Sequence, residues 1–151
     1  MSEWSDTWTY SDDQWHEGNP PIVGAREHAF WLGSSVFDGA RAFEGVMPDL
    51  DLHCQRLNKS AEALGLNATK SADEIEALCR EGVAKFDGEP ALYIRPMYYA
   101  TQGGPMAVGA LPESTKFLLS IYVTPMPEPK GMSVCVSPFR RPTQECMPLD
   151  A

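Results

Sequence analysis

Apolar residues recur at helical spacing in the middle of the chain. Leu52, Leu57, Ala61 and Leu64 lie largely on one face of a helical projection, and Gly65 follows as a residue suited to a helix C-terminus. The pattern therefore predicts an amphipathic helix that ends near residue 65.

A second helix is predicted directly after the first. Ser71 and Glu74 have the spacing of a capping box, in which serine and glutamate side chains satisfy free backbone N–H groups. The apolar face that follows comprises Ile75, Leu78, Val83 and Phe86, and Asp-Gly at 87–88 marks its end. The two helices are expected to pack as a helical pair.

The N-terminal residues follow a less regular pattern. Residues 1–21 place aromatic side chains between acidic ones and then reach Gly-Asn-Pro-Pro at 18–21, which indicates a turn. This segment is expected to form a short hairpin or an extended arm. Residues 25–37 have helical spacing, although the Gly-Ser-Ser run at 33–35 weakens that prediction.

β-rich apolar runs dominate the rest of the chain, at residues 91–99, 117–124 and 132–137. Alternate prolines at 125, 127 and 129 favour an extended connector. The predicted fold class is α+β, a sheet covered on one side by the helical pair. Three segments are expected: a small domain at 1–124, an interdomain connector at 125–131, and the first strand of a second, cofactor-binding domain at 132–151.

Composition limits the classes of function. The chain has 151 residues, and its 21 acidic against 12 basic side chains give a net charge of −9, which disfavours nucleic acid and anionic membrane surfaces as partners. There is no apolar run of membrane-spanning length, and the N-terminus lacks signal-peptide features, so we expect a cytoplasmic protein. The four cysteines are widely spaced, which favours free thiols over a metal site.

Three segments together resemble one known family. They are Gly-Ser-Ser-Val-Phe-Asp-Gly-Ala-Arg-Ala-Phe at 33–43, His-Cys-Gln-Arg-Leu-Asn-Lys-Ser-Ala at 53–61, and Tyr-Ile-Arg-Pro at 93–96. They are similar to the motifs of the branched-chain aminotransferases, pyridoxal-phosphate-dependent enzymes of fold type IV. The resemblance implies a homodimer that transfers an amino group between an amino acid and a 2-oxo acid such as 2-oxoglutarate.

The resemblance gives Arg56 a role in cofactor binding. The matching arginine of the family holds the phosphate of pyridoxal 5′-phosphate, and a planar guanidinium is suited to grip a phosphate through parallel hydrogen bonds. The alternative is an ordinary solvent-facing arginine on the first predicted helix.

Tyr93 and Arg95 are two residues apart on a predicted strand, so their side chains share one face. An arginine beside a tyrosine suits a substrate carboxylate, and family members use the matching pair at the substrate pocket. The alternative assigns Arg95 to a cross-strand ion pair and Tyr93 to the core.

The same resemblance implies further substrate-binding residues. Phe37 would be an apolar wall of the pocket, Gly39 would allow close backbone approach, and Arg41 would supply nearby charge. Leu32 is the main departure, because the usual branched-chain enzyme has tyrosine just before the Gly-Ser/Thr-Ser motif. The missing hydroxyl leaves the amino-acid specificity open.

The catalytic group itself is expected outside the printed sequence. A transaminase needs a lysine amine that forms a Schiff base with the cofactor and moves a proton. The family's lysine context is absent around Lys59, Lys70, Lys85, Lys116 and Lys130. Arg141, Pro148 and Ala151 fit the start of that context, so we expect the chain to be incomplete and a modified lysine to follow Ala151.

Other functions remain open at this point. Relatives on the same scaffold act on D-amino acids, chiral amines or aminodeoxychorismate, and a non-catalytic half-domain is a further alternative. The three histidines, at 16, 28 and 53, are assigned surface or capping roles, and no metal site is predicted.

Overall fold

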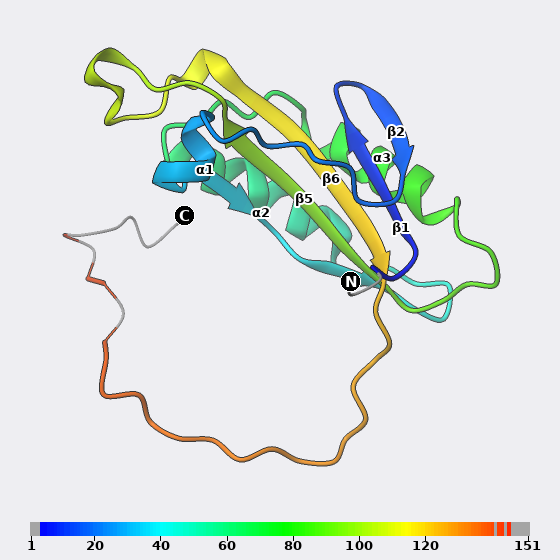
Figure 1. Ribbon diagram of the computed structural model, residues 1–151. Coiled ribbons are helices and arrows are strands. Elements are labelled where there is room, and N and C mark those ends of the chain that lie inside the picture. The colour runs from blue at the N-terminus through cyan, green and yellow to red at the C-terminus, as the bar shows by residue number, and fades with distance from the viewer. Residues whose placement is uncertain (1–3, 141, 144, 146–151) are drawn as a thin grey trace.

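The computed structural model describes residues 4–140, 142, 143 and 145, and these form an α+β domain. Its antiparallel sheet of six strands has the order β2-β1-β6-β5-β3, and β4 also pairs with β5. Figure 1 shows α2 and α3 together on one side of this sheet. The predicted sheet with a helical pair on one face is confirmed.

The central strands are β5 (Leu92–Ala100) and β6 (Thr115–Val123), which pair along their whole length. Both lie close to the predicted runs. The loop between them contains two short 3-10 turns, Pro105–Ala107 and Pro112–Ser114. The long apolar strands thus form the framework to which the shorter elements attach.

The N-terminal hairpin pairs β1 (Thr7–Ser11) with β2 (Gln14–Glu17), and β1 also pairs with β6. Its turn is Asp12-Asp13, where both residues have positive φ, 47° and 58°. Aspartate tolerates this left-handed backbone better than most residues do. The hairpin prediction is confirmed, but its turn precedes the Gly-Asn-Pro-Pro run.

The segment at 25–37 is only partly helical. α1 (His28–Leu32) ends at Gly33, whose φ of 67° stops the helix, and β3 (Ser35–Phe37) begins directly afterwards. β4 (Ala40–Ala42) follows, and both short strands pair with β5. The helical prediction is wrong beyond Gly33, because pairing with β5 satisfies the backbone of these residues better than a further helical turn.

The two helices of the covering layer are α2 (Leu50–Ala63) and α3 (Ala72–Val83). The capping box is confirmed, with the Ser71 hydroxyl accepting from the Glu74 N–H and the Glu74 carboxylate accepting from the Ser71 N–H. Side chains from both layers meet in one core, which includes Leu57, Ile75, Ile94, Leu119 and Ile121, all fully buried. The core fixes α2 against the underside of the sheet.

The segment predicted as a strand at 132–137 is unpaired in this structure, and its place as the first strand of a second domain stays a prediction. These residues lie in extended backbone without strand pairing, and Met132, Val134 and Val136 are 88%, 85% and 97% exposed. An extended segment becomes a strand only when a neighbour offers backbone partners, and no described strand lies beside this one. Figure 1 shows the segment leaving the sheet after β6.

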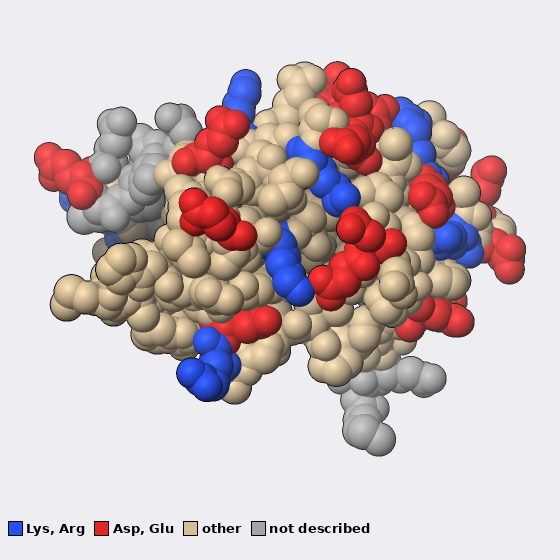
Figure 2. Space-filling model, turned by 90° about the horizontal axis from the view of Figure 1, so that it is seen from above, with Lys and Arg blue, Asp and Glu red and all other residues tan. Residues whose placement is uncertain are grey.

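Charged side chains are mixed on the molecular surface. On the face shown in Figure 2, basic side chains stand beside acidic ones and form no continuous basic patch. Within the described residues, no helix has both the length and the apolarity that a membrane crossing requires.

Candidate functional site

The sheet has an open face opposite the helices, and the predicted substrate residues Tyr93 and Arg95 lie on it. Because side chains alternate along a strand, Tyr93 and Arg95 point away from the buried Leu92 and Ile94. Tyr93 is also directly opposite Arg41 on β4. The predicted shared face of Tyr93 and Arg95 is confirmed.

Arg95 lies among three aromatic rings. Its guanidinium carbon is 5.8 Å, 5.1 Å and 5.3 Å from the ring centroids of Phe37, Tyr93 and Tyr122, which is within cation–π distance. One Nη2 donor reaches the Tyr122 hydroxyl. Nε is buried without a hydrogen-bond partner, and within the described residues no carboxylate pairs with this guanidinium. Arg95 is therefore a cation with unused hydrogen-bond donors. It does not form the cross-strand ion pair that was the alternative to a substrate-binding role.

A cavity of about 380 Å³ opens beside Arg95. Its lining is rich in hydroxyl and amide groups and comprises Trp4, Ser5, Thr7, Asn19, Arg95, Ser120, Tyr122 and Thr124. A cavity of this size accepts a small molecule, and its polar groups can orient one. A positively charged side chain with polar neighbours favours an anionic ligand.

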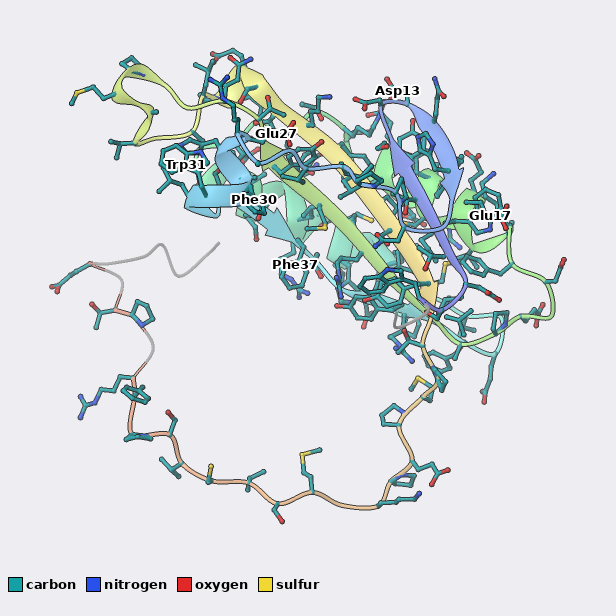
Figure 3. All side chains as sticks on the ribbon, in the orientation of Figure 1. Asp13, Glu17, Glu27, Phe30, Trp31 and Phe37 are labelled. Carbon is teal, nitrogen blue, oxygen red and sulfur yellow. The ribbon has the colours of Figure 1, made fainter. Side chains whose placement is uncertain are left out.

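Phe37 is 59% exposed and lies on the open side of β3. Figure 3 shows it along the same side of the molecule as Phe30 and Trp31 of α1, which are also largely exposed. Leu32, at the end of α1, is 46% exposed. Phe37 thus forms one wall of the Arg95 environment, whereas a pocket position for Leu32 stays a prediction.

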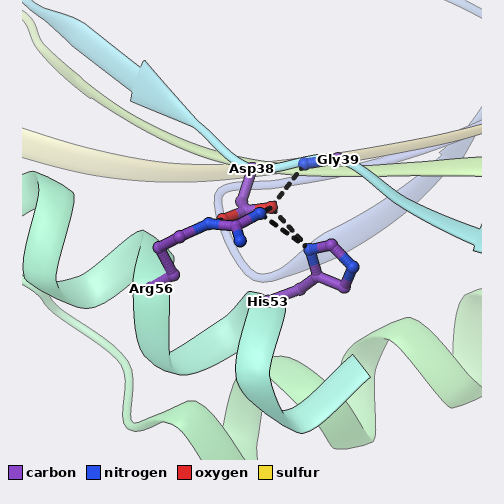
Figure 4. Close-up of polar contacts among 4 residues, drawn as sticks. All are labelled: Asp38, Gly39, His53 and Arg56. Carbon is purple, nitrogen blue, oxygen red and sulfur yellow. Dashed lines mark hydrogen bonds and ion pairs between the residues drawn. The ribbon is translucent and has the colours of Figure 1, made fainter. Parts of the chain in front are cut away.

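A buried carboxylate that the sequence patterns did not single out organises the edge of the site. Asp38 follows β3, and only 3% of its side chain is exposed. Arg56 on α2 donates to it through Nε at 2.6 Å and Nη2 at 2.7 Å, and the Gly39 N–H donates at 2.7 Å (Figure 4). Hydrogen bonding and charge from Asp38 raise the pKa of Arg56.

His53 completes this cluster from the same helix. Its Nδ1 lies 2.8 Å from an Asp38 carboxylate oxygen, as Figure 4 shows. Arg56 Nη2 lies 3.1 Å from the same nitrogen, so His53, Arg56 and Asp38 form one polar cluster. His53 therefore binds a buried acid instead of standing free at the surface. The acidic position within the Phe-Asp-Gly motif was the available signal for Asp38.

Gly39 connects the two arginine environments. A Cβ atom at this position would lie 2.1 Å from the Tyr93 hydroxyl oxygen, so only glycine fits without displacement. Asp38 therefore binds the Arg56 guanidinium, and the absence of a side chain at Gly39 leaves room for the Tyr93 hydroxyl. Arg56 contacts Asp38, and the neighbouring Gly39 lies against Tyr93, whereas a direct contact of Arg56 with the face bearing Tyr93 and Arg95 stays a prediction.

Arg41 lies opposite Tyr93 and also contacts the segment that follows β6. Its Nη2 donates to the Thr124 carbonyl at 2.7 Å and lies 3.0 Å from the Met126 sulfur. The side chain thus anchors the start of the connector after β6, and part of its donor capacity is used there. A direct role for Arg41 in substrate binding stays a prediction.

The lysines of the chain lie in ion pairs or in solvent. Lys70 pairs with Asp13, Lys85 with Glu81, Lys116 with Asp12 and Lys130 with Glu128, whereas Lys59 is exposed on α2. None of them takes part in the contacts around Asp38 or Arg95. Arg141, Pro148 and Ala151, on which the lysine prediction rests, lie outside the described residues.

His28 corrects the prediction of a surface or capping role. It is 3% exposed, with Nδ1 2.8 Å from the Ser34 hydroxyl and Nε2 3.2 Å from the Ala107 carbonyl, so it ties α1 to the loop between β5 and β6. Within residues 4–140, 142, 143 and 145, no cluster of three or more candidate metal ligands occurs.

Comparison with known proteins identifies relatives over most of the chain. The family model for amino-transferase class IV matches residues 35–148. A probable branched-chain-amino-acid aminotransferase of Rickettsia typhi is 33% identical over 125 residues, which are 82% of this chain and 43% of that protein.

Solved structures show the same fold. A crystal structure of an aminotransferase from Brucella abortus bound to PLP has 53% sequence identity and a TM-score of 0.93, covering 97% of this chain and 52% of that one. A branched-chain aminotransferase from Thermoproteus uzoniensis, solved with norvaline, has a TM-score of 0.78 at 23% identity, covering 95% and 50%. This chain thus spans about half the length of the proteins it matches. The family match includes the segments that contain Asp38, Arg56 and Arg95, and the chain belongs to the class IV aminotransferase family.

Proposed function

We propose that this chain forms the substrate-binding half of a pyridoxal-phosphate-dependent aminotransferase, which acts on a branched-chain or related amino acid and 2-oxoglutarate. The observation that carries the proposal is the continuous cluster in which Asp38-Gly39 joins Arg56 to Tyr93 and Arg95. Two guanidinium groups with unused donors suit a ligand with a phosphate and a carboxylate.

The residues present fit the cofactor's phosphate. Asp38 occupies the Nε and Nη2 donors of Arg56, whereas Nη1 has no acceptor among the described residues. The Arg56 side chain is 62% exposed, so an anion can approach it from solvent. Pyridoxal phosphate, when bound, supplies the electron sink for the carbanion chemistry of amino acids.

Arg95 is the proposed carboxylate-binding residue. The aromatic rings of Phe37, Tyr93 and Tyr122 shield one part of the guanidinium from water, which strengthens its attraction for an anion. The Tyr93 hydroxyl adds a polar group near Gly39. The exposed ring of Phe37 offers an apolar surface for an aliphatic side chain.

The proton-transferring amine is proposed to be the lysine that the family pattern predicts after Ala151. The lysines of the chain itself are paired with acids or exposed, and none lies in the Asp38 or Arg95 cluster. The proposed division of labour is that this half binds and orients the anionic groups, and the predicted lysine moves the proton.

The proposal is tested by kinetics of the complete polypeptide that carries this sequence, loaded with pyridoxal phosphate. Leucine with 2-oxoglutarate is the expected pair, and D-alanine and an (R)-amine test the other class IV activities. Arg95→Gln is expected to raise KM for 2-oxoglutarate about 10- to 100-fold, since a charge-assisted bond to a carboxylate is lost.

Arg80→Gln is the matched control, because Arg80 lies on α3 and pairs with Glu76 far from the open face. It is expected to leave KM unchanged. No turnover of any of the three donors by the wild-type holoprotein, or equal KM values for wild type and Arg95→Gln, contradicts the proposal.

We also propose a cytoplasmic homodimer. Cys54 and Cys79 are free thiols in the core, and free thiols are typical of a reducing compartment. The exposed Phe30 and Trp31 of α1, together with Phe37, form an apolar surface of the kind that subunits bury. Light scattering of the complete protein is expected to give twice the mass of one polypeptide, and the monomer mass contradicts the dimer.

A further inference from the structure

We propose that Asp38 is a positioning residue, which fixes the Arg56 guanidinium in the one orientation that presents its Nη1 donors to a phosphate. This inference rests on the proposed function, because it assumes that Arg56 binds the cofactor's phosphate. It adds a residue that touches neither phosphate nor substrate and acts through Arg56.

The two partners differ sharply in burial. The Asp38 side chain is 3% exposed and the Arg56 side chain is 62% exposed. Asp38 is held by the Gly39 N–H and by His53 in addition to Arg56, and its own N–H donates to the Pro96 carbonyl on β5. The carboxylate is thus fixed to the sheet, and the flexible arginine is oriented by it.

The geometry leaves one part of the guanidinium free. A planar guanidinium has five N–H donors, and the bidentate contact at 2.6 Å and 2.7 Å uses the edge formed by Nε and Nη2. The two Nη1 donors point away from the carboxylate. An arginine that is already ordered loses less conformational entropy when it binds an anion.

Electrostatic attraction alone predicts that Asp38 weakens phosphate binding, which is the opposite of what a positioning role predicts. A negative carboxylate next to Arg56 weakens the local positive potential, so its removal would tighten the binding of a phosphate. A positioning role predicts that its removal loosens the binding. Asp38→Asn separates the two, because the amide has nearly the same shape but no negative charge.

The measurement uses the complete polypeptide and two probes, pyridoxal 5′-phosphate and pyridoxal, which lacks the phosphate. Dissociation constants come from the visible absorbance of each bound probe. Asp38→Asn is expected to weaken pyridoxal 5′-phosphate binding at least about tenfold and to change pyridoxal binding less than about twofold. Tighter or unchanged binding of pyridoxal 5′-phosphate overturns the inference, and so does an equal loss for both probes, which indicates a general structural role.

Matched variants control for charge and folding. Asp51→Asn makes the same charge change in the first turn of α2 at an exposed position, and is expected to alter neither constant. Asp38→Glu keeps the charge but lengthens the side chain, and is expected to weaken pyridoxal 5′-phosphate binding less than Asp38→Asn. If Asp38→Asn does not fold, Asp38→Glu decides, and an unchanged constant overturns the inference.

A double-variant cycle tests whether Asp38 acts through Arg56. In an Arg56→Ala background, Asp38→Asn is expected to have no further effect on pyridoxal 5′-phosphate binding. A full additional loss overturns the inference. If Arg56→Ala itself leaves binding unchanged, the phosphate role within the proposed function fails as well. If Arg56→Ala weakens binding and Asp38→Asn does not, only the positioning role fails.

Discussion

On the helix side of β5, Leu92, Ile94 and Tyr98 are fully buried, whereas on the other side Tyr93 and Arg95 are only partly covered. The same strand therefore contributes to two different environments. The helix side is close-packed and nearly all apolar, and the open side holds a guanidinium with an unpaired buried Nε.

The difference shows how the fold can support unused hydrogen-bonding groups. Leaving a buried donor without a partner costs free energy, and the apolar packing on the opposite side of the same strand supplies the stability that tolerates this cost. Backbone pairing of β5 with β6 on one side and β3 and β4 on the other then holds the open-face residues in register. Packing on the apolar side of β5 thus fixes the positions of the side chains on its open side.

The largest contrast is expected from truncating one residue on each side of β5. Ile94→Ala removes a fully buried side chain and is expected to lower the free energy of unfolding by about 2–5 kcal/mol. Met97→Ala, on the partly exposed open side, is expected to cost about 1 kcal/mol. Urea denaturation followed by circular dichroism measures both, and equal losses would mean that the open side is packed like the core.

A smaller effect is expected where the open face meets the Asp38 cluster. Gly39→Ala places a Cβ against the Tyr93 hydroxyl, and the resulting overpacking is expected to cost about 1–3 kcal/mol. Tyr93→Ala removes the obstacle, so the double variant is expected to be no less stable than Tyr93→Ala alone. Additive losses in thermal denaturation would show that Tyr93 is not what excludes a side chain there.

The third comparison concerns Tyr98, a polar group on the apolar side. Burial raises the pKa of Tyr98 above its ordinary value of 10.0, and its hydroxyl contacts Asn58 and the Lys70 backbone. Because the folded state holds this proton more tightly, the stabilisation is present below about pH 10 and is lost as pH rises further. Tyr98→Phe is expected to cost about 1–3 kcal/mol at pH 7.

Denaturation at several pH values checks the sign of this effect. The stability of Tyr98→Phe is expected to fall less steeply above pH 10 than that of the wild type, with the remaining slope coming from other tyrosines such as Tyr99, whose pKa burial also raises. An identical alkaline slope in both proteins would exclude Tyr98 as a contributor.

The smallest loss of stability is expected from a change in the helix pair. Ser71→Ala removes the capping box of α3 and is expected to cost about 1 kcal/mol. Ligand binding by the open face should be unaffected, because α3 contacts only the other side of the sheet. A changed dissociation constant for pyridoxal phosphate would show that the two sides are coupled through the helices.

Local signals explain which parts of the fold the sequence could predict. The capping box of Ser71 and Glu74 needs only four consecutive residues, and β5 and β6 are long enough for apolar, β-branched and aromatic residues to mark them. The shared face of Tyr93 and Arg95 follows from strand alternation once the strand is known.

Features that depend on distant partners could not be predicted in this way. β3 and β4 have three residues each, too few for a period, and form because β5 lies beside them. The contact of Asp38 with Arg56 joins a strand end to a helix, and no local pattern reports it. Conversely, residues 132–137 have a strand-like composition but lack a described pairing neighbour.

The pairing of β1 with β6 has a consequence for how the chain reaches its native state during synthesis. Thr7 lies opposite Tyr122, so β1 leaves the ribosome long before β6 and has to wait for it before it takes its place in the sheet. The β1–β2 hairpin is local and can form in the meantime. We therefore expect the edge of the nascent hairpin that later binds β6 to be the surface most in need of protection by a chaperone until translation passes β6.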